Sequence, residues 1–96
     1  MDSTKIIMTR LGGAAFQLRT GVRNPQPIPG GIAIDLPRAR TKKGADRARI
    51  LRADDGTYSL EIIKRNGRAF RWVDVADGVC AEDLLERFSN LTGLVV

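Results

Sequence analysis

The fold of this chain is decided by residues 57–75, which read TYSLEIIKRNGRAFRWVDV. Both flanks of this stretch are rich in β-branched and aromatic residues that alternate with polar ones, a pattern typical of strands. Between them, Asn66 and Gly67 can supply the two positive φ angles of a type I′ turn. We therefore predict a β-hairpin with Asn66 and Gly67 at the centre of its turn.

The segments on either side of the hairpin predict one more strand and a helix. Upstream, residues 49–53 have a strand pattern and residues 54–56, Asp-Asp-Gly, suit a tight turn, so an antiparallel meander is expected over about residues 47–75. Downstream, apolar residues recur with helical spacing over about residues 80–91, and Gly93 suits the end of that helix. The apolar stripe of the helix consists of Leu84, Leu85, Phe88 and Leu91.

The N-terminal third of the chain allows two interpretations. Its apolar residues approximate a helical stripe, but Gly12 and Gly13 would cost a helix interior about 2 kcal/mol relative to alanines and suit a bend between strands. We therefore favour two strands over a helix for residues 4–20, with the helix as the alternative. Residues 23–31 contain three prolines and two glycines and predict a loop, after which residues 31–36 resume as a short strand.

Together these segments predict a single domain over residues 1–96 of the α+β class. It consists of an antiparallel sheet, made of the meander of about residues 47–75 plus N-terminal strands, packed on one C-terminal helix of about residues 80–91. A chain of 96 residues with 43% hydrophobic residues is large enough for one core. The apolar run of residues 6–8 is too short to cross a membrane, so we expect a soluble protein without a membrane partner.

Two features of the composition limit the chemistry. The chain has no histidine, which removes the commonest general base and the commonest metal ligand. Cys80 is the only cysteine, so no internal disulfide or zinc-thiolate cluster can form, and a reducing compartment such as the cytoplasm is favoured. We therefore expect no enzyme, no catalytic residue, no metal and no cofactor, with Cys80 as a buried structural thiol.

The chain is basic, with a net charge of +5, and nearly half of its 16 lysines and arginines lie in residues 38–52. We predict a basic loop over residues 37–47. Such a cluster can neutralise the phosphates of a nucleic acid and release its counterions. The alternative is a solvated loop that only keeps the protein in solution. The candidate cations in and next to this loop are Arg38, Arg40, Lys42, Lys43, Arg47 and Arg49.

The predicted turn also assigns side chains to the two faces of the hairpin, because neighbouring residues of a strand point to opposite faces. It places Arg65 opposite Arg68 and Ile63 opposite Phe70, on a face that also holds Trp72. Rings and guanidinium groups on one sheet surface suit base stacking and phosphate contacts. The alternative is that the N-terminal segment covers these rings as a second small core. The other face, which we expect in the main core, carries Tyr58, Leu60, Ile62, Val73 and Val75.

These patterns predict a small binding module that contacts nucleic acid through phosphates and aromatic stacking, without strong sequence readout. The alternative is a protein-interaction or regulatory module that docks on an acidic partner surface, as a monomer or a homodimer. The candidate site consists of Arg38, Arg40, Lys42, Lys43, Arg47, Arg49, Arg65, Arg68, Phe70 and Trp72.

Four short motifs between residues 47 and 91 add a resemblance in architecture. They are Gly56-Thr57-Tyr58, Glu61-Ile62, Asn66-Gly67-Arg68 and Ala81-Glu82-Asp83. With its order of three strands and a helix and its basic sheet face, this part of the chain resembles the DNA-binding domains of plant AP2-type factors and integrase arm-binding domains. The resemblance implies a sheet that binds nucleic acid. The chain departs from these domains by a shorter helix and by 46 additional N-terminal residues.

Overall fold

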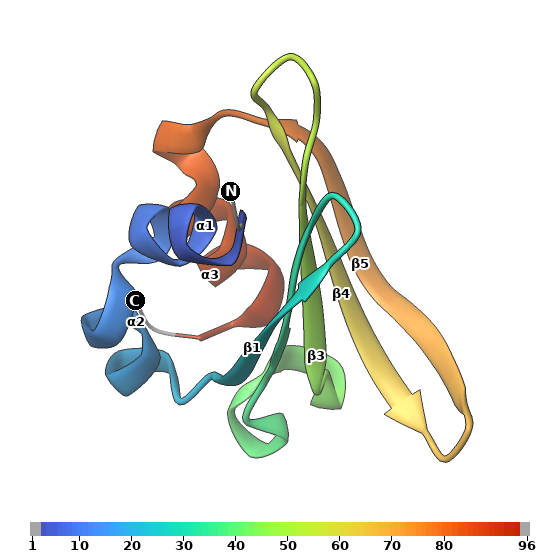
Figure 1. Ribbon diagram of the computed structural model, residues 1–96. Helices are drawn as coiled ribbons and strands as arrows, with labels where there is room; N and C mark the ends of the chain where they lie inside the picture. Colours follow the sequence, from blue (N-terminus) through green and yellow to red (C-terminus); the bar gives the residue numbers. More distant parts are fainter. Residues whose placement is uncertain (1–2, 95–96) are drawn as a thin grey trace.

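A computed structural model describes residues 3–94, which form a five-stranded antiparallel sheet with helices on one face (Figure 1). The strands lie in the sheet in their sequence order, β1-β2-β3-β4-β5. Their bounds are β1 Arg23–Ile28, β2 Gly31–Asp35, β3 Arg47–Arg52, β4 Tyr58–Asn66 and β5 Ala69–Val79. The predicted α+β class and its antiparallel sheet are confirmed, and the predicted meander corresponds to β3, β4 and β5.

The helices are α1 (Ser3–Leu11), α2 (Gly13–Thr20) and α3 (Leu84–Thr92), and the 3-10 turn η3 (Ala81–Asp83) leads into α3. They lie together on one side of the sheet (Figure 1). The predicted C-terminal helix is confirmed, with Leu84 and Phe88 fully buried, and it ends at Gly93 with a φ of 80°. The core between helices and sheet also includes Ile7, Leu11, Phe16, Ile32, Ile34, Ile50, Leu60 and Ile62.

The N-terminal segment forms two helices, so our preference for two strands over residues 4–20 is wrong. Gly12 has a φ of 119° and stands between α1 and α2, where its freedom of conformation is needed. The glycines therefore separate two short helices instead of weakening the middle of one. Ile7, Leu11 and Phe16 are buried, and the ring of Phe16 meets that of Phe88 edge-on with centroids 5.2 Å apart.

Residues 23–31 are not the predicted loop, because Arg23–Ile28 is strand β1 at one edge of the sheet. It pairs with β2 through partners such as Gln26 with Ala33, and only Pro29 and Gly30 form the turn. Proline cannot donate a ladder hydrogen bond, but an edge strand needs donors on one side only. The prolines thus restrict this segment to the edge without excluding it from the sheet.

The β4–β5 hairpin is confirmed, but its turn lies one residue later than predicted. Gly67 and Arg68 are its central residues, so that Arg65 faces Phe70 and Ile63 faces Trp72. Only Gly67 has a positive φ, of 65°, as in a type II′ turn with glycine at its first central position. Arg68 therefore lies in the turn and not on a face of the ladder.

An irregularity in the pairing of β4 with β5 changes which residues of β5 face outward. The register shifts between Ile62 and Ile63, so that Val75 faces Glu61. Val75 is 39% exposed, which corrects its predicted place in the core, whereas Val73 still packs partly against the core. Cys80, expected to be buried, is exposed just before η3, while its neighbour Val79 is buried.

The predicted basic loop of residues 37–47 is ordered as two short 3-10 turns, η1 (Arg38–Arg40) and η2 (Lys42–Gly44), and Arg47 already belongs to β3. Thr41 ties the two turns together, since its hydroxyl donates to the carbonyl oxygen of Ala45 over 2.6 Å. No helix within residues 3–94 is long and apolar enough to span a membrane.

Candidate nucleic-acid interface

The sheet face opposite the helices is open, and we call it the outer face. The alternation of each strand and the register bring together side chains from four strands. One row across the sheet runs from Asp35 through Arg47 and Ile63 to Trp72. The outer face therefore combines aromatic, aliphatic and charged groups.

The two predicted aromatic rings lie exposed on this face. Phe70 and Trp72 are each 57% exposed, whereas Ile63, the register partner of Trp72, is only 4% exposed. The N-terminal helices lie on the other side of the sheet, so the alternative in which the N-terminal segment covers the rings as a second core is wrong. Both rings belong to β5, the other edge strand of the sheet, and they are open to a partner.

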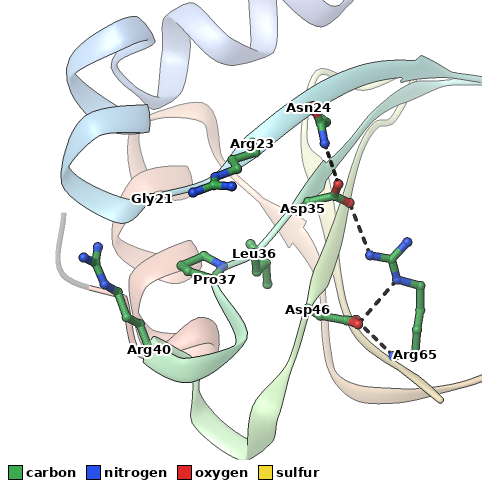
Figure 2. A pocket seen from close by; sticks show the side chains of 9 residues that line it. All are labelled: Gly21, Arg23, Asn24, Asp35, Leu36, Pro37, Arg40, Asp46 and Arg65. Atoms are coloured by element: carbon green, nitrogen blue, oxygen red, sulfur yellow. Dashed lines mark hydrogen bonds and ion pairs between the residues drawn. The ribbon is translucent and has the colours of Figure 1, made fainter.

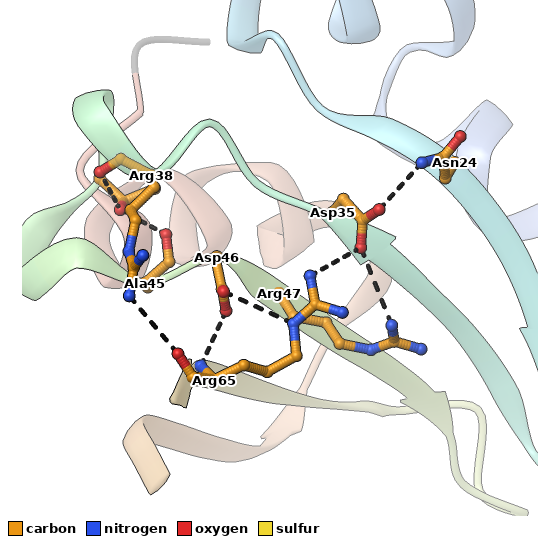
Figure 3. A network of polar contacts seen from close by, with 8 residues as sticks. Asn24, Asp35, Arg38, Ala45, Asp46, Arg47 and Arg65 are labelled. Carbon is orange, nitrogen blue, oxygen red and sulfur yellow. Dashed lines mark hydrogen bonds and ion pairs between the residues drawn. The ribbon is translucent and has the colours of Figure 1, made fainter. Parts of the chain in front are cut away.

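The arginines at the centre of the outer face are paired with carboxylates of the same protein (Figure 3). Asp35 lies 3.8 Å from Nη1 of Arg47 and 3.4 Å from Nη2 of Arg65. Asp46 accepts a hydrogen bond of 3.0 Å from the backbone N–H of Arg65, whose Nε is 3.5 Å from the same carboxylate. These contacts hold the guanidinium groups in place and reduce their net charge.

Arg49 is paired in the same way on the next row. Its Nε donates to Oε1 of Glu61 over 2.7 Å, and the Glu61 side chain is only 15% exposed. Three of the predicted phosphate ligands therefore already have carboxylate partners within the fold.

The outer face also contains a hollow of about 480 Å³. Its lining is apolar at Ile63 and Phe70 and at the β1–β2 end of the sheet, with three arginines around it. The complete lining is Ile28, Pro29, Arg47, Arg49, Leu51, Ile63, Arg65 and Phe70. This hollow can receive an apolar or aromatic group of a partner.

The hairpin tip, which we define as residues 64–72, has a different character. Residues 65–72 are all exposed, and the tip projects past the helices (Figure 1). It carries four cations, Lys64, Arg65, Arg68 and Arg71, and no acidic residue. Arg65 is paired with Asp35 and Asp46, so within residues 3–94 the unpaired positive charge of the tip comes from Lys64, Arg68 and Arg71.

The predicted cations of residues 38–43 lie away from the outer face and contact other parts of the fold. Lys42 donates a hydrogen bond of 2.7 Å to the backbone oxygen of Asn90, one of the last carbonyls of α3, where a positive charge is favourable. Arg38 donates to the backbone oxygen of Arg65 over 3.4 Å. Lys43 lies in η2 with a φ of 58° and contacts no outer-face residue through a hydrogen bond or ion pair.

Arg40 lines a separate hollow of about 520 Å³ at the end of the sheet (Figure 2). Its Nη1 is 3.2 Å from the point where a side chain on Gly21 would begin. Arg23, Arg65, Asp35 and Asp46 line the same hollow, so its charges are mixed. The structure therefore brings Arg47, Arg49, Arg65, Phe70 and Trp72 together on the outer face, places Arg68 at the hairpin tip, and leaves Arg38, Arg40, Lys42 and Lys43 apart.

Sequence reasoning missed two sets of residues in this region. The carboxylates Asp35, Asp46 and Glu61 order the arginines, but only the register of distant strands reveals these pairs. Lys64 and Arg71 belong to the exposed tip, and the absence of acidic residues from residues 62–73 was a signal that could have identified them.

Among the described residues, the one resolved pKa change belongs to Asp55, in the turn between β3 and β4. Hydrogen bonds from the hydroxyl and the backbone N–H of Thr57 hold the pKa of Asp55 below its ordinary value of 3.8. This carboxylate orders the β3–β4 turn and has no part in the outer face. Among the residues that the structure describes, no three histidine, cysteine, aspartate or glutamate side chains are grouped so as to hold a metal ion.

No protein-family model matches the chain, and no curated protein or solved structure matches it. The resemblance in strand order to the DNA-binding domains is therefore an analogy of architecture alone, and a function can be inferred only from the residues of the site.

Proposed function

We propose that the protein binds nucleic acid through the tip of its β4–β5 hairpin. Phe70 and Trp72 stack on bases, and the cations of the tip contact phosphates. The observation that carries the proposal is one exposed segment, residues 65–72, which holds two aromatic rings and two arginines, Arg68 and Arg71, that form no ion pair within the described chain.

The physical basis is that every base offers a flat face to an aromatic ring and every nucleotide a phosphate to a cation. A stacked base contributes about 1–3 kcal/mol. The phosphate contribution does not depend on sequence and weakens as salt rises, because binding releases condensed counterions. The paired arginines at the centre of the outer face, Arg47 and Arg49, position the bound strand and contribute less to the salt dependence than the tip does.

Trp72 is the only tryptophan, so its fluorescence reports directly on the tip. The experiment titrates the protein with single-stranded DNA, duplex DNA and single-stranded RNA of equal length, at low and at raised salt. We expect quenching by at least one of the three, and loss of that quenching at high salt. If none of the three quenches or binds at low salt, the proposal is wrong.

Matched variants separate the tip from the rest of the surface. Phe70→Ala is expected to weaken binding by about 1–3 kcal/mol, whereas Leu18→Ala, which truncates an apolar side chain that is 84% exposed on α2, leaves binding unchanged. Arg68→Ala is expected to lower affinity and the salt slope, and its control is Arg10→Ala on α1. Equal effects of the tip variants and their controls would contradict the proposal.

A protein partner is the second candidate, and the apolar hollow on the outer face is the observation that favours it. Phe70 and Ile63 line this hollow, and the three arginines around it have carboxylate partners, so it suits a ring or aliphatic group better than a phosphate. The tip cations without a carboxylate partner in the described chain, Lys64, Arg68 and Arg71, would contact an acidic surface of such a partner. This reading is supported if Phe70→Ala abolishes binding to a protein partner while no nucleic acid binds.

A further inference from the structure

The inner side of the hairpin tip, facing away from the outer face, carries its own group of cations. We call Arg38, Lys64 and Arg71 the inner cation cluster. Lys64 and Arg71 are register partners on β4 and β5, so their side chains leave the ladder on the same face. They line a hollow of about 410 Å³ with Asn66, Ala69 and Phe70, and no acidic residue of the described chain lines it.

Arg38 approaches Lys64 from the connection between β2 and β3. Its Nη2 donates to the backbone oxygen of Arg65 over 3.4 Å. Its Nε lies 4.0 Å, and Nζ of Lys64 3.6 Å, from the point where a Cβ on Gly44 would stand. Nε of Arg38 and Nζ of Lys64 therefore lie close to the same point beside Gly44, so these two side chains are neighbours.

The cluster lacks the carboxylates that neutralise the arginines of the outer face. Within residues 3–94, the ion pairs join Arg47, Arg49 and Arg65 to carboxylates, and no pair includes a member of the inner cation cluster. Like charges that face each other across a ladder repel, and an anion between them would turn that repulsion into attraction. Asp46, which follows the connection that carries Arg38, contacts Arg65 instead of the cluster.

We infer that the inner cation cluster is a binding site for a phosphate group. Lys64 and Arg71 supply the charge from the hairpin, Arg38 supplies it from the connection, and Asn66 adds an amide donor at the rim. A phosphate offers several acceptor oxygens, which suits donors that converge from three segments.

Where the bound phosphate belongs to a nucleic acid, this inference rests on the proposed function. Phe70 lines both the hollow on the outer face and the hollow of the cluster. A strand stacked on Phe70 and Trp72 therefore passes around the edge of β5, and its neighbouring phosphate enters the cluster. A phosphorylated small molecule would occupy the same site without the rings.

The test compares Lys64→Gln/Arg71→Gln with Arg10→Gln/Arg87→Gln, which changes the charge equally on exposed residues of α1 and α3. In the first arm, pyrophosphate is added at constant ionic strength and the thermal midpoint is followed by circular dichroism, with chloride as the reference. We expect the midpoint of the wild type and of the control to rise with pyrophosphate, and that of the Lys64/Arg71 variant to stay constant. In chloride alone, the variant is expected to melt above the wild type, because a repulsion has been removed.

The second arm measures the salt dependence of single-stranded DNA binding through Trp72. The Lys64/Arg71 variant is expected to reduce the salt slope by about 1 relative to wild type and control, with the same maximal quenching. An unchanged slope together with no effect of pyrophosphate would overturn the inference while leaving the proposed function intact. Pyrophosphate binding that needs Lys64 and Arg71, without binding of any nucleic acid, would uphold the site and refute the proposed function.

Discussion

The β4–β5 hairpin has a base and a tip that share one hydrogen-bonded ladder and differ in what covers them. At the base, Tyr58, Leu60 and Ile62 are at most 2% exposed beneath the helices. At the tip, residues 65–72 are all exposed. The apolar residues that build the core therefore lie mainly in the base half of β4, whereas the groups offered to a partner lie in the tip of the hairpin. Changes at the base should therefore affect stability, and changes at the tip should affect binding.

The largest difference between base and tip is expected when one large apolar side chain is truncated in each. Leu60→Ala removes a fully buried side chain and is expected to lower the free energy of unfolding by about 2–5 kcal/mol. Phe70→Ala is expected to change it by less than about 0.5 kcal/mol, because its ring is exposed. Urea unfolding followed by far-ultraviolet circular dichroism measures both. Comparable losses in the two variants would show that Phe70 belongs to the folded core after all.

Two glycines extend the same comparison to the backbone. A Cβ on Gly31, at the start of β2, would clash with the backbone oxygen of Ile50, so Gly31→Ala must push β2 and β3 apart and is expected to cost about 3 kcal/mol. A Cβ on Gly67 would meet nothing within 4 Å, and Gly67→Ala is expected to cost about 1 kcal/mol through its φ of 65° alone. Thermal unfolding ranks the two. A larger loss for Gly67→Ala would mean that the tip is packed more tightly than its exposure indicates.

Breaking one internal ion pair tests whether the carboxylates limit the charge of the outer face. Glu61→Gln removes the negative charge opposite Arg49 and is expected to cost about 1 kcal/mol of stability, because the pair is only partly exposed. It is also expected to strengthen single-stranded DNA binding about two- to threefold at low salt, since the face gains a positive charge. Asp54→Asn, an equal charge change in the β3–β4 turn, serves as the control. If both variants bind alike, the pairing of Arg49 has no influence on the interface.

The smallest effect is expected from Asp55, at the end of β4 far from the tip. Hydrogen bonds from Thr57 lower the pKa of Asp55 in the folded protein below its ordinary value of 3.8. The carboxylate therefore stabilises the fold above that ordinary value, and this stabilisation is lost as the pH falls through the lowered pKa. Asp55→Asn should make stability less sensitive to acid in urea unfolding at several pH values, with DNA binding at neutral pH unchanged. An acid response identical to that of the wild type would contradict this assignment.

The residues of the meander and the last helix could be predicted from the sequence because their signals are local. Alternation in residues 57–75 and the stripe that includes Leu84 and Phe88 report directly on burial. The N-terminal helices were missed because Gly12 was weighed as an interior residue, whereas it separates two helices. The proline-rich segment was interpreted as a loop. A strand can contain these prolines only at the edge of a sheet, and the local sequence does not show that β1 lies at an edge.

The candidate site could be predicted only in part, because some of its features follow from local sequence patterns and others depend on distant strands. The outward direction of Phe70 and Trp72 follows from alternation, and it survived the one-residue displacement of the turn because the predicted and observed registers keep these residues on the same face. The ion pairs of Arg47, Arg49 and Arg65 depend on strands far apart in the sequence. The contact of Lys42 with Asn90 joins residues 48 positions apart, so no pattern within residues 37–47 could reveal it.

The prolines of β1 have a consequence for self-association. At that edge, Pro25 and Pro27 present no N–H, so an incoming strand cannot complete a ladder against it. In the described part of the chain, β5 is the only strand with an outer rim able to accept another strand. If β5 paired edge to edge with β5 of a second copy, the combined sheet of the described residues would have no further edge able to accept a strand. Growth would therefore end at two subunits, and the prolines protect the protein against endless strand-by-strand polymerisation into fibres.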